Sequence, residues 1–408
     1  MPSYVDLYYT PTEEDLICEF YVEPEKISIK ECSKHIAAES STGTWTEVKT
    51  MKKRIEKISA KVFSIDKKKR IIKVAYPLEL FEQANIPQIL SSIAGNIFGM
   101  KIVRNLRLLD VSIPKKMLRG FKGPEVGLED IRKITKIKER PIIGTIFKPK
   151  VGLTPKEMAD LAYKIYSAGV DYTKDDENLG SMRFNKFEER VIKMLDVIDR
   201  IRREQGRNVI YAANITAPAE TMLKRAEFVK KHGGKCIMID IITSGWSSLQ
   251  YIVECMIGSK MIIHAHRAGH ASFTRNTKHG ISMLVVAKFA RLAGVSALHT
   301  GTVVGKMEAS EQEVVKINNF LRSNINGIKK VMPIASGGLH PGLVPNVIKI
   351  LGKDLIINFG GGLWGHPMGA EAGAIAIKQA IEAAMKGIPI KEYAKEKKEL
   401  REALKRWM

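Results

Sequence analysis

The feature that most constrains the fold is a repeated alternation of short apolar runs and amphipathic helices from about residue 141 onward. Eight runs rich in β-branched residues occupy 141–147, 170–176, 209–215, 236–242, 261–266, 297–302, 330–336 and 355–360. Most are followed by a segment with helical periodicity, for instance 155–167, 184–204, 219–232 and 281–292. Repeated strand–helix units form parallel sheets with right-handed crossovers, and eight of them close into a barrel. We therefore expect an α/β protein with a C-terminal (β/α)8 TIM barrel.

The first 120 residues show a different pattern. Strand-like runs at 15–23, 61–65 and 71–76 alternate with helical segments at 27–38 and 86–97. This order favours a smaller N-terminal α+β domain of ferredoxin-like type, with helices packed on an antiparallel sheet. We predict domains at 1–120 and 141–408, with 121–140 as the linker region and a helical extension at the C-terminal end of the barrel domain.

The composition is that of a soluble globular protein with an unusual charge. Of 408 residues, 45 % are hydrophobic, and no apolar run reaches the ~18–20 residues of a membrane helix. The polar N-terminus and the four scattered cysteines predict a reduced, cytoplasmic protein. Many Lys, Ile and Glu residues beside few glutamines suggest a thermophile. The net charge of +22 raises nucleic-acid binding as an alternative, but the lysines are spread along the chain and form no patch with aromatic residues.

Polar residues and glycines follow seven of the eight runs, at the end of a barrel strand where function is placed. In chain order these are Lys148 and Lys150, then 174–177, Asn214, His264, His266 and Arg267, His299, 336–338 and 360–362. The fourth run offers only Thr243 and Ser244, to which we assign no role. Residues placed by chance would be scattered over both ends of the barrel. The clustering therefore predicts an active site at the C-terminal face.

The second run leads into the most informative cluster, VDYTKDDEN at 170–178. Side chains alternate along a strand, so Lys174 and Asp176 share a face, and Glu177 joins them if the chain bends there. Paired carboxylates at a strand end suit Mg²⁺. Because an ammonium cannot ligate a metal, Lys174 is either a salt-bridge partner or chemically modified. For this stretch taken alone, a solvated acidic turn is the alternative.

Two further groups of residues predict anion binding. The glycines of Ser336-Gly337-Gly338 and 360–362 follow the last two strands, where barrel enzymes bind phosphate through backbone N–H groups. His266, Arg267 and His299 are candidates for a second anion site, since a guanidinium matches phosphate oxygens. Two such sites across one barrel mouth would select a small bisphosphate.

Three lysines are candidates for chemistry at this mouth. Lys148 and Lys150 flank a proline, and a lysine near other cations has a lowered pKa suited to proton transfer. Phosphate neutralisation or simple solvation is the alternative for both. The segment 303–308 follows the sixth run, and Gly301 and Gly305 could hinge a short lid there that brings Lys306 over the site.

Taken together, these segments closely resemble the large subunit of ribulose-1,5-bisphosphate carboxylase/oxygenase (RuBisCO). The matching motifs are ESSTGTWT (39–46), AGNIFG (94–99), KPKVGL (148–153), VDYTKDDEN (170–178), HAHRAGH (264–270), LHTGTVVGKME (298–308), ASGGLHP (335–341) and FGGGLWGHP (359–367). They occur in order over nearly the whole chain. The short length and the wording of several motifs are similar to the archaeal form III branch.

The resemblance implies a role for each matched position. Lys174 would react with CO₂ to form a carbamate that binds Mg²⁺ with Asp176 and Glu177 and acts as the base that forms the enediol. Lys148, His266 and Lys306 would be the other catalytic residues, with Lys306 stabilising the new carboxylate. Substrate-binding residues would be Glu39, Thr44, Trp45, Asn96, Lys150, Arg267, His299, Ser336, Gly337, Gly338, Gly360 and Gly361.

The resemblance also implies the reaction and the partners. The chain would enolise ribulose-1,5-bisphosphate and add CO₂ or O₂ to give 3-phosphoglycerate, in an archaeal pathway of nucleotide (AMP) salvage. In the family Glu39, Thr44, Trp45 and Asn96 belong to a partner subunit, so we expect a homodimer or an assembly of dimers with shared active sites. No small subunit, membrane or specific nucleic acid is expected as a partner.

Few positions depart from the family pattern. Gly269 stands where methionine is usual, and Asn358 where glutamine is common. A related homologue that only enolises or isomerises a metabolite is the main competing interpretation within the fold. Such homologues have typically lost the lid lysine or several phosphate ligands, whereas Lys306, Arg267 and His299 are present here.

Overall fold

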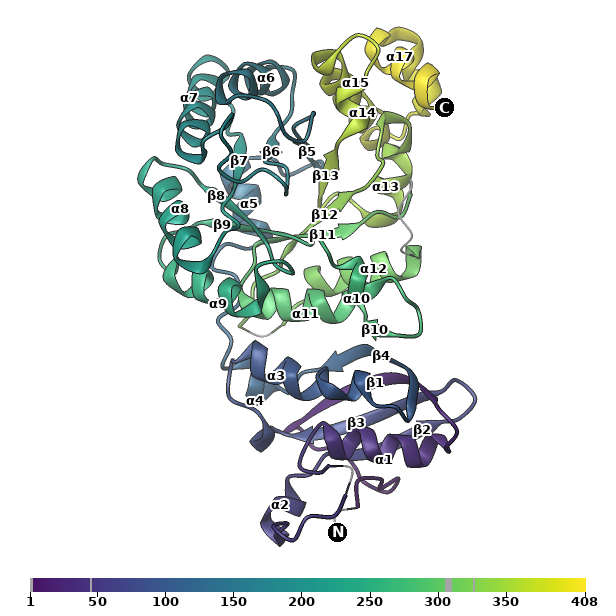
Figure 1. Cartoon of the computed structure of the whole chain (residues 1–408). Coiled ribbons are helices and arrows are strands. Elements are labelled where there is room, and N and C mark those ends of the chain that lie inside the picture. The colour runs from purple at the N-terminus through teal and green to yellow at the C-terminus, as the bar shows by residue number, and fades with distance from the viewer. Residues whose placement is uncertain (1–2, 45, 305–309, 326) are drawn as a thin grey trace. The chain divides into compact units, whose positions relative to one another are not determined.

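The computed structural model describes residues 3–44, 46–304, 310–325 and 327–408. The chain forms two compact units, one made of Met1–Lys122 with Gly269–Ala293 and the other of Gly123–Ala268 with Gly294–Met408. We call them the N-terminal unit and the barrel unit. The first holds a five-stranded sheet and the second a closed barrel of eight strands (Figure 1).

The N-terminal unit is built on a mainly antiparallel sheet with the strand order β10-β4-β1-β3-β2. Its strands are β1 (Asp15–Pro24), β2 (Lys61–Asp66), β3 (Ile71–Pro77), β4 (Val103–Ser112) and β10 (Gly280–Ile281). Alternate residues of β1, such as Leu16, Cys18 and Phe20, are fully buried, as expected for a strand with one face on a core. With α1 (Ile29–Glu39) between β1 and β2 and α3 (Ile86–Ile93) between β3 and β4, the predicted ferredoxin-like arrangement is confirmed.

The helix predicted at 86–97 is shorter than its periodicity indicated. It ends at Ile93, and Asn96 belongs to a separate 3-10 turn, η2 (Asn96–Gly99). At Gly95 the backbone passes so close to Ser91 that a Cβ would lie 2.1 Å from the Ser91 carbonyl oxygen. Only glycine fits this close approach.

The segment Gly269–Ala293 groups with the N-terminal unit, although the strand–helix pattern placed its helix in the barrel. It contains α10 (Ala271–Thr274), β10 and α11 (Met283–Ala293). β10 adds to β4 in parallel, and Lys288 of α11 donates to Asp110 of β4 over 2.5 Å. Smaller elements of this unit are α2 (Lys53–Lys57), η1 (Leu78–Leu80) and α4 (Lys115–Leu118).

The barrel unit contains eight parallel strands, as the sequence predicted. In order around the barrel they are β5 (Ile142–Ile146), β6 (Tyr172–Lys174), β7 (Ile210–Asn214), β8 (Cys236–Asp240), β9 (Ile262–His266), β11 (Ala297–Gly301), β12 (Met332–Ser336) and β13 (Ile356–Phe359). β13 pairs with β5 and closes the ring. Most of these strands are buried along their whole length, which explains why they read as unbroken apolar runs.

One end of the barrel is filled by apolar side chains. Leu128 and Ile131 of α5 (Leu128–Thr135) pack in one cluster with the first residues of several strands, including Ile142, Ile210 and Ile262. These are N-terminal strand ends. The helix therefore covers that end of the barrel, and the C-terminal end is left for function.

Helices follow the strands around the outside of the barrel (Figure 1). They are α6 (Pro155–Ser167), α7 (Phe187–Gln205), α8 (Ala219–Lys231), α9 (Gly245–Cys255), α12 (Glu311–Arg322), η3 (Pro341–Leu343), α13 (Val344–Leu351), α14 (Gly361–Trp364), α15 (Ala370–Met385), α16 (Ile390–Tyr393), η4 (Ala394–Glu396) and α17 (Lys398–Trp407). α7 begins later than the predicted residue 184 because Met182 and Asn185 exchange backbone hydrogen bonds in a tight turn. Among the described residues, no helix has both the length and the apolar character needed to cross a membrane.

Candidate active site

The barrel residues predicted for the site lie at the C-terminal ends of the strands. Lys148 follows β5, Lys174 ends β6, His266 ends β9, His299 lies in β11, Ser336 ends β12, and Gly360 follows β13. Because the strands of the closed barrel are parallel, all these positions are at the same end. The polar clusters that were scattered along the sequence therefore share one face.

The centre of this face is a cluster of lysines and carboxylates. Lys174 Nζ lies 3.2 Å from Glu177 Oε2 and 2.9 Å from the Asp175 carbonyl oxygen. Lys148 Nζ lies 3.1 Å from Asp176 Oδ2. Lys174 is 1 % exposed, and burial lowers its pKa against the opposing effect of Glu177 and Asp176. A larger fraction of this amine is therefore neutral than in an ordinary lysine.

A buried network holds the backbone of this cluster in place. The Asp175 carboxylate accepts from Arg190 Nε at 3.1 Å, from the Tyr211 hydroxyl at 2.7 Å and from the Asn214 backbone at 2.9 Å. Asp175 and Arg190 are both fully buried. Burial opposes the charge of Arg190, but Asp175 outweighs it and raises the pKa of the guanidinium. Asp175 thus points away from its neighbour Asp176 and serves to anchor the turn.

The turn after β6 is also fixed from its other side. The Asn214 side-chain amide at the end of β7 donates to the carbonyl oxygens of Asp176 and Glu177 at 3.3 and 3.2 Å. The Asn178 side chain donates to Asp176 Oδ1 at 2.9 Å. These contacts produce the bend that the sequence required for Glu177 to join Lys174 and Asp176.

The fourth strand contributes a residue that sequence reasoning missed. Asp240 ends β8, and its Oδ1 lies 2.6 Å from His266 Nδ1. His266 Nε2 lies 3.5 Å from Glu177 Oε2. Burial and the nearby charge of Lys174 lower the pKa of His266, although Asp240 opposes this. A carboxylate beside one ring nitrogen keeps the proton there and leaves a lone pair on the other.

His299 links two further strands. Its Nδ1 lies 2.8 Å from Ser336 Oγ, and its Nε2 lies 2.9 Å from His264 Nε2. The ring of His266 packs edge-on against that of His299 at 4.7 Å between centroids. Burial lowers the pKa of His299 well below its usual value. Two of the residues predicted for anion binding, His299 and Ser336, are thus in direct contact.

Arg267 is 7 % exposed, and its burial lowers its pKa to about 10. It lies beside Gly301, where a Cβ would stand 2.8 Å from Arg267 Nη2. Gly301 has a φ of 88°, a conformation that favours glycine. The predicted lid residue Lys306 lies outside the described residues.

The three glycines at 360–362 differ in how closely other atoms surround them. At Gly362 a Cβ would lie 2.1 Å from the Leu339 carbonyl oxygen, so this residue allows the two loops to pack together. Gly361 has no neighbouring atom within 4 Å of a Cβ position, and it is exposed. Near Gly360 a Cβ would lie 3.8 Å from Lys148 Cε. Gly360 and Gly361 are therefore open to a ligand, whereas Gly362 has a packing role.

The other predicted residues that the structure describes are exposed or only partly buried. Lys150 is exposed after β5. In the N-terminal unit, Glu39 ends α1 and is partly buried, while Thr44 and Asn96 are exposed. Trp45 lies outside the described residues.

The cluster at Lys174 fits a hard divalent cation. Two carboxylates, those of Asp176 and Glu177, converge on lysine ammonium groups, so negative oxygen donors and replaceable cations share one small volume. Oxygen donors of this kind suit Mg²⁺. Among the described residues no group of three or more His, Cys, Asp and Glu side chains is arranged for a metal. The fit to Mg²⁺ therefore depends on whether Lys174 is chemically modified so that it offers an oxygen ligand beside Asp176 and Glu177.

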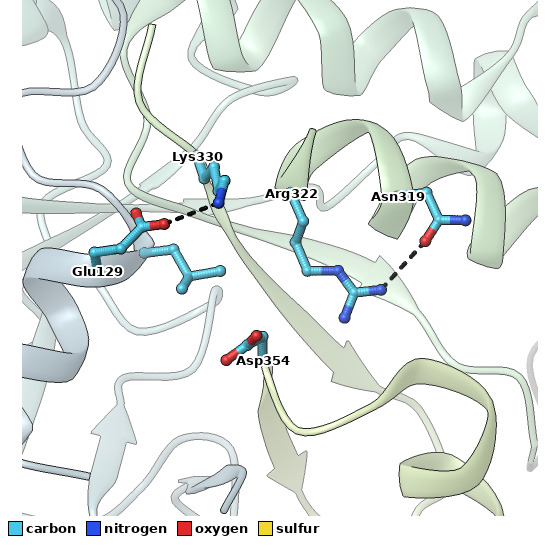
Figure 2. A pocket seen from close by; sticks show the side chains of 6 residues that line it. Glu129, Asn319, Arg322, Lys330 and Asp354 are labelled. Atoms are coloured by element: carbon cyan, nitrogen blue, oxygen red, sulfur yellow. Dashed lines mark hydrogen bonds and ion pairs between the residues drawn. The ribbon is translucent and has the colours of Figure 1, made fainter. Parts of the chain in front are cut away.

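A pocket of about 390 Å³ lies at the opposite end of the barrel strands, lined by Leu128, Glu129, Asn319, Arg322, Lys330 and Asp354. Figure 2 shows Lys330 turned toward Glu129 and Arg322 toward Asn319, at 3.2 and 3.3 Å. Asp354 pairs with Arg132 at 2.8 Å. Both carboxylates of this pocket are thus paired within the protein, Arg322 also donates to the Leu351 carbonyl oxygen at 2.6 Å, and N-terminal barrel ends serve stability. It is not the candidate active site.

Known proteins match this chain over nearly its whole length. The N-terminal domain model of the ribulose bisphosphate carboxylase large chain matches residues 3–117, and the catalytic domain model of the same chain matches residues 127–407. Ribulose bisphosphate carboxylase of Pyrococcus abyssi is 50 % identical over 99 % of this chain and 96 % of its own length. That of Methanocaldococcus jannaschii is 47 % identical over 99 % of this chain and 100 % of its own length.

Solved structures give the same result. Octameric ribulose-1,5-bisphosphate carboxylase/oxygenase from Pyrococcus horikoshii, in complex with sulfate, superposes with a TM-score of 0.95 at 49 % identity, over 99 % of this chain and 96 % of that one. A dimeric archaeal RuBisCO from Hyperthermus butylicus superposes with a TM-score of 0.93 at 46 % identity, over 99 % of this chain and 98 % of that one. The resemblance drawn from the sequence motifs is confirmed.

Proposed function

The chain belongs to the ribulose bisphosphate carboxylase large-chain family, and on that premise we propose that it is an archaeal form III RuBisCO with a carbamylated, Mg²⁺-dependent centre. It is a carbon–carbon lyase that adds CO₂ to ribulose-1,5-bisphosphate and yields 3-phosphoglycerate, with O₂ as the alternative gas. The observation that carries the finer proposal is the buried amine of Lys174 beside the carboxylates of Asp176 and Glu177.

The activating step takes place at Lys174. A neutral amine attacks CO₂, forming an N–C bond and releasing one proton, and the product is a carbamate with two oxygen atoms. Burial, which lowers the pKa of this lysine, favours the neutral amine that the step requires. Carbamate formation changes Lys174 from a cation to an anion. Three neighbouring anionic groups, the carbamate, Asp176 and Glu177, then replace the Lys174–Glu177 ion pair. Such a set of oxygen donors would hold Mg²⁺.

Bound there, Mg²⁺ would supply Lewis-acid polarisation of substrate oxygens. The carbamate oxygen of Lys174 acts as the base that takes a carbon-bound proton of the substrate and forms its enediol. Lys148, whose ammonium lies beside Asp176, would give a proton to the carbanion that remains when a carbon–carbon bond of the carboxylated intermediate breaks. Both steps are proton transfers at carbon.

His266 would transfer protons at the substrate hydroxyls. We propose that Nδ1 carries the proton and donates it to Asp240, which leaves the lone pair on Nε2, the nitrogen that faces Glu177. A neutral imidazole in this tautomer accepts a proton from a hydroxyl and passes it on. The lowered pKa of His266 keeps it neutral at physiological pH.

The two phosphates would be bound on opposite sides of the cluster. Gly360 and Gly361, with Thr44 and Trp45, form one site, and Arg267 and His299 form the other. Ser336, Gly337 and Gly338 add contacts to sugar and phosphate. Support for this arrangement comes from the open backbone at Gly361 and the buried guanidinium of Arg267.

A complete site would need two subunits. Glu39, Thr44, Trp45 and Asn96 would come from the N-terminal unit of a partner, and Lys150 and Lys306 from the same barrel as Lys174. The relatives of known structure include an octamer and a dimer. We propose a homodimer or an assembly of such dimers, without a small subunit, acting in the cytoplasm in nucleotide (AMP) salvage.

The test is fixation of ¹⁴CO₂ into acid-stable product. The full-length protein is preincubated with bicarbonate and Mg²⁺ and supplied anaerobically with ribulose-1,5-bisphosphate at moderate and at high temperature. Label in 3-phosphoglycerate is expected. Lys174→Met should abolish it, whereas Lys164→Met, an exposed lysine on α6, should leave it intact. Mass spectrometry after carbamate trapping should find the added group on Lys174.

Two outcomes would count against the proposal. Full activity of Lys174→Met would exclude the carbamate centre. No label at any temperature from folded dimer would exclude carboxylation and favour a homologue that only enolises or isomerises a related metabolite.

A further inference from the structure

A chain of hydrogen bonds runs from the core of the barrel to the site. Cys236 Sγ lies 3.1 Å from the Tyr172 hydroxyl, which lies 2.7 Å from His264 Nδ1. His264 Nε2 then lies 2.9 Å from His299 Nε2, and His299 Nδ1 lies 2.8 Å from Ser336 Oγ. The five residues come from β6, β8, β9, β11 and β12. The chain thus crosses the interior of the barrel.

This chain of hydrogen bonds is buried except at its Ser336 end. Cys236, Tyr172, His264 and His299 are at most 3 % exposed, whereas Ser336 is partly exposed. Burial lowers the pKa of both histidines well below the usual value, so each ring is neutral and carries one N–H. Burial also raises the pKa of the Cys236 thiol to about 12, which keeps its proton in place.

Neutral rings allow two directions of donation. In the first, Tyr172 donates to His264 Nδ1, His264 Nε2–H donates to His299, and His299 Nδ1–H donates to Ser336. The Ser336 hydroxyl hydrogen is then free. In the second, Ser336 donates to His299, and the chain ends with Tyr172 donating to Cys236 Sγ. The Ser336 hydroxyl then offers only lone pairs to a ligand.

The buried end decides between the two directions. An imidazole nitrogen is a strong acceptor for a phenol, and the Tyr172–His264 distance of 2.7 Å is that of a good O–H donor bond. A thiol sulfur is a weak acceptor. The first direction is therefore favoured.

We propose that Tyr172 and His264 are positioning residues that fix the tautomer of His299 and thereby leave the Ser336 hydroxyl as a hydrogen-bond donor for an anionic ligand oxygen. A phosphate dianion only accepts hydrogen bonds, so this direction matches the bisphosphate substrate. The inference deepens the proposed function, since it rests on Ser336 contacting that substrate. Its first consequence, the two tautomers, is independent of catalysis.

The first experiment measures the tautomers directly. Neutron diffraction from deuterium-exchanged crystals of the full-length protein should place deuterium on Nε2 of His264 and on Nδ1 of His299. Nitrogen-15 shifts of ring-labelled histidine should agree. Deuterium on Nδ1 of His264 and Nε2 of His299 would overturn the inference, even if carboxylation is intact.

The second experiment removes only the phenol oxygen. Tyr172→Phe is expected to give mixed tautomers at His299 and to raise KM for ribulose-1,5-bisphosphate by roughly three- to tenfold, the effect of one hydrogen bond, with kcat nearly unchanged. The matched control is Tyr166→Phe. Tyr166 is equally buried and its hydroxyl bonds to Thr173 and to the Ile210 carbonyl oxygen, outside the chain.

Each result of the second experiment has a definite meaning. Unaltered tautomers and an unaltered KM in Tyr172→Phe would overturn the inference. Equal changes in Tyr172→Phe and Tyr166→Phe would also overturn it, because they would indicate general loosening of β6. If Tyr172→Phe does not fold, the tautomers of the unmodified protein decide. If the protein shows the expected tautomers but no carboxylation, the proposed function is refuted and this inference about the tautomers is not.

Discussion

His266 Nδ1 lies 2.6 Å from Asp240 Oδ1, and the two residues are direct neighbours across the β8–β9 pair. The contact fixes the orientation of the imidazole at the edge of the carboxylate cluster. It also gives the fourth barrel strand a part in the site, where the sequence had offered only Thr243 and Ser244. The ring is therefore oriented by a residue of the strand beside its own.

Replacing Asp240 by asparagine tests this orientation. Asp240→Asn removes the acceptor that holds the proton on Nδ1, and an amide NH₂ beside that nitrogen favours the opposite tautomer. We expect kcat for carboxylation to fall by roughly 10–100-fold, the range for losing a carboxylate partner of a functional histidine. KM for ribulose-1,5-bisphosphate should change little. Asp160→Asn, on the exposed face of α6, is the control, and an unchanged kcat in Asp240→Asn would contradict the role.

Two adjacent glycines separate packing from binding. Gly362→Ala forces a Cβ to within 2.1 Å of the Leu339 carbonyl oxygen, so it should lower Tm and the yield of folded protein. Gly361→Ala has nothing within 4 Å and should leave Tm unchanged, while the methyl group obstructs a phosphate and raises KM. Thermal unfolding and steady-state kinetics of both variants check this. Equal Tm values for the two variants would refute the distinction.

The buried pair beneath the cluster should dominate local stability. Arg190→Met leaves the buried Asp175 carboxylate without its cation, which costs about 3–5 kcal/mol of unfolding free energy. Arg200→Met on the same helix removes an exposed pair with Glu204, and such pairs are worth about 0.2–1 kcal/mol. Urea unfolding of the two variants gives the comparison. Similar losses in both would show that burial of the pair has no energetic effect.

Acid unfolding should report on Glu23 of the N-terminal unit. The carboxylate accepts from Tyr21 at 2.7 Å and from Asn105, and pairs with Lys278 at 3.3 Å. The hydrogen bonds from Tyr21 and Asn105 lower the pKa of Glu23 from 4.5 to about 2. Because the folded-state pKa is the lower one, the stabilisation is complete above pH 4.5 and is lost as the pH falls toward 2.

Glu23→Gln should remove this contribution. We expect about 1.5–3 kcal/mol less unfolding free energy at pH 7, the range for hydrogen bonds to a charged group, and a flatter dependence between pH 4.5 and 2. Glu19→Gln on the same strand, which breaks only the partly exposed pair with Lys73, is the control. Parallel pH profiles for the unmodified protein and Glu23→Gln would disprove the assignment.

Periodicity predicted the barrel because each strand is buried on both faces and so reads as an apolar run. It also predicted the strand ends at which most candidate residues lie, since the end of an apolar run can be read directly from the sequence. Asp240 was missed because it lies inside such a run, and only the pairing of β8 with β9 brings it to His266. The spacing of residues along one strand does not show which residues of the neighbouring strand lie beside them.

Three other differences have the same kind of cause. The early end of α3 follows from the contact of Gly95 with Ser91, a steric limit that helical periodicity does not report. The different roles of Gly361 and Gly362 depend on where Leu339 lies. The placement of Gly269–Ala293 with the N-terminal unit depends on the pairing of β10 with β4, which joins residues far apart in the chain.

That pairing has a consequence for synthesis of the protein. A ribosome releases β1 to β4 early, but β10 and α11 emerge only after the whole stretch Gly123–Ala268 has been made. Until then β4 is an open sheet edge, with unpaired backbone groups that attract other strands. The N-terminal unit therefore cannot complete its folding until the first five barrel strands, β5 to β9, have been made. Nascent chains stalled before β10 should be the most prone to aggregate, and a fragment ending at Lys122 should need α11 supplied in trans.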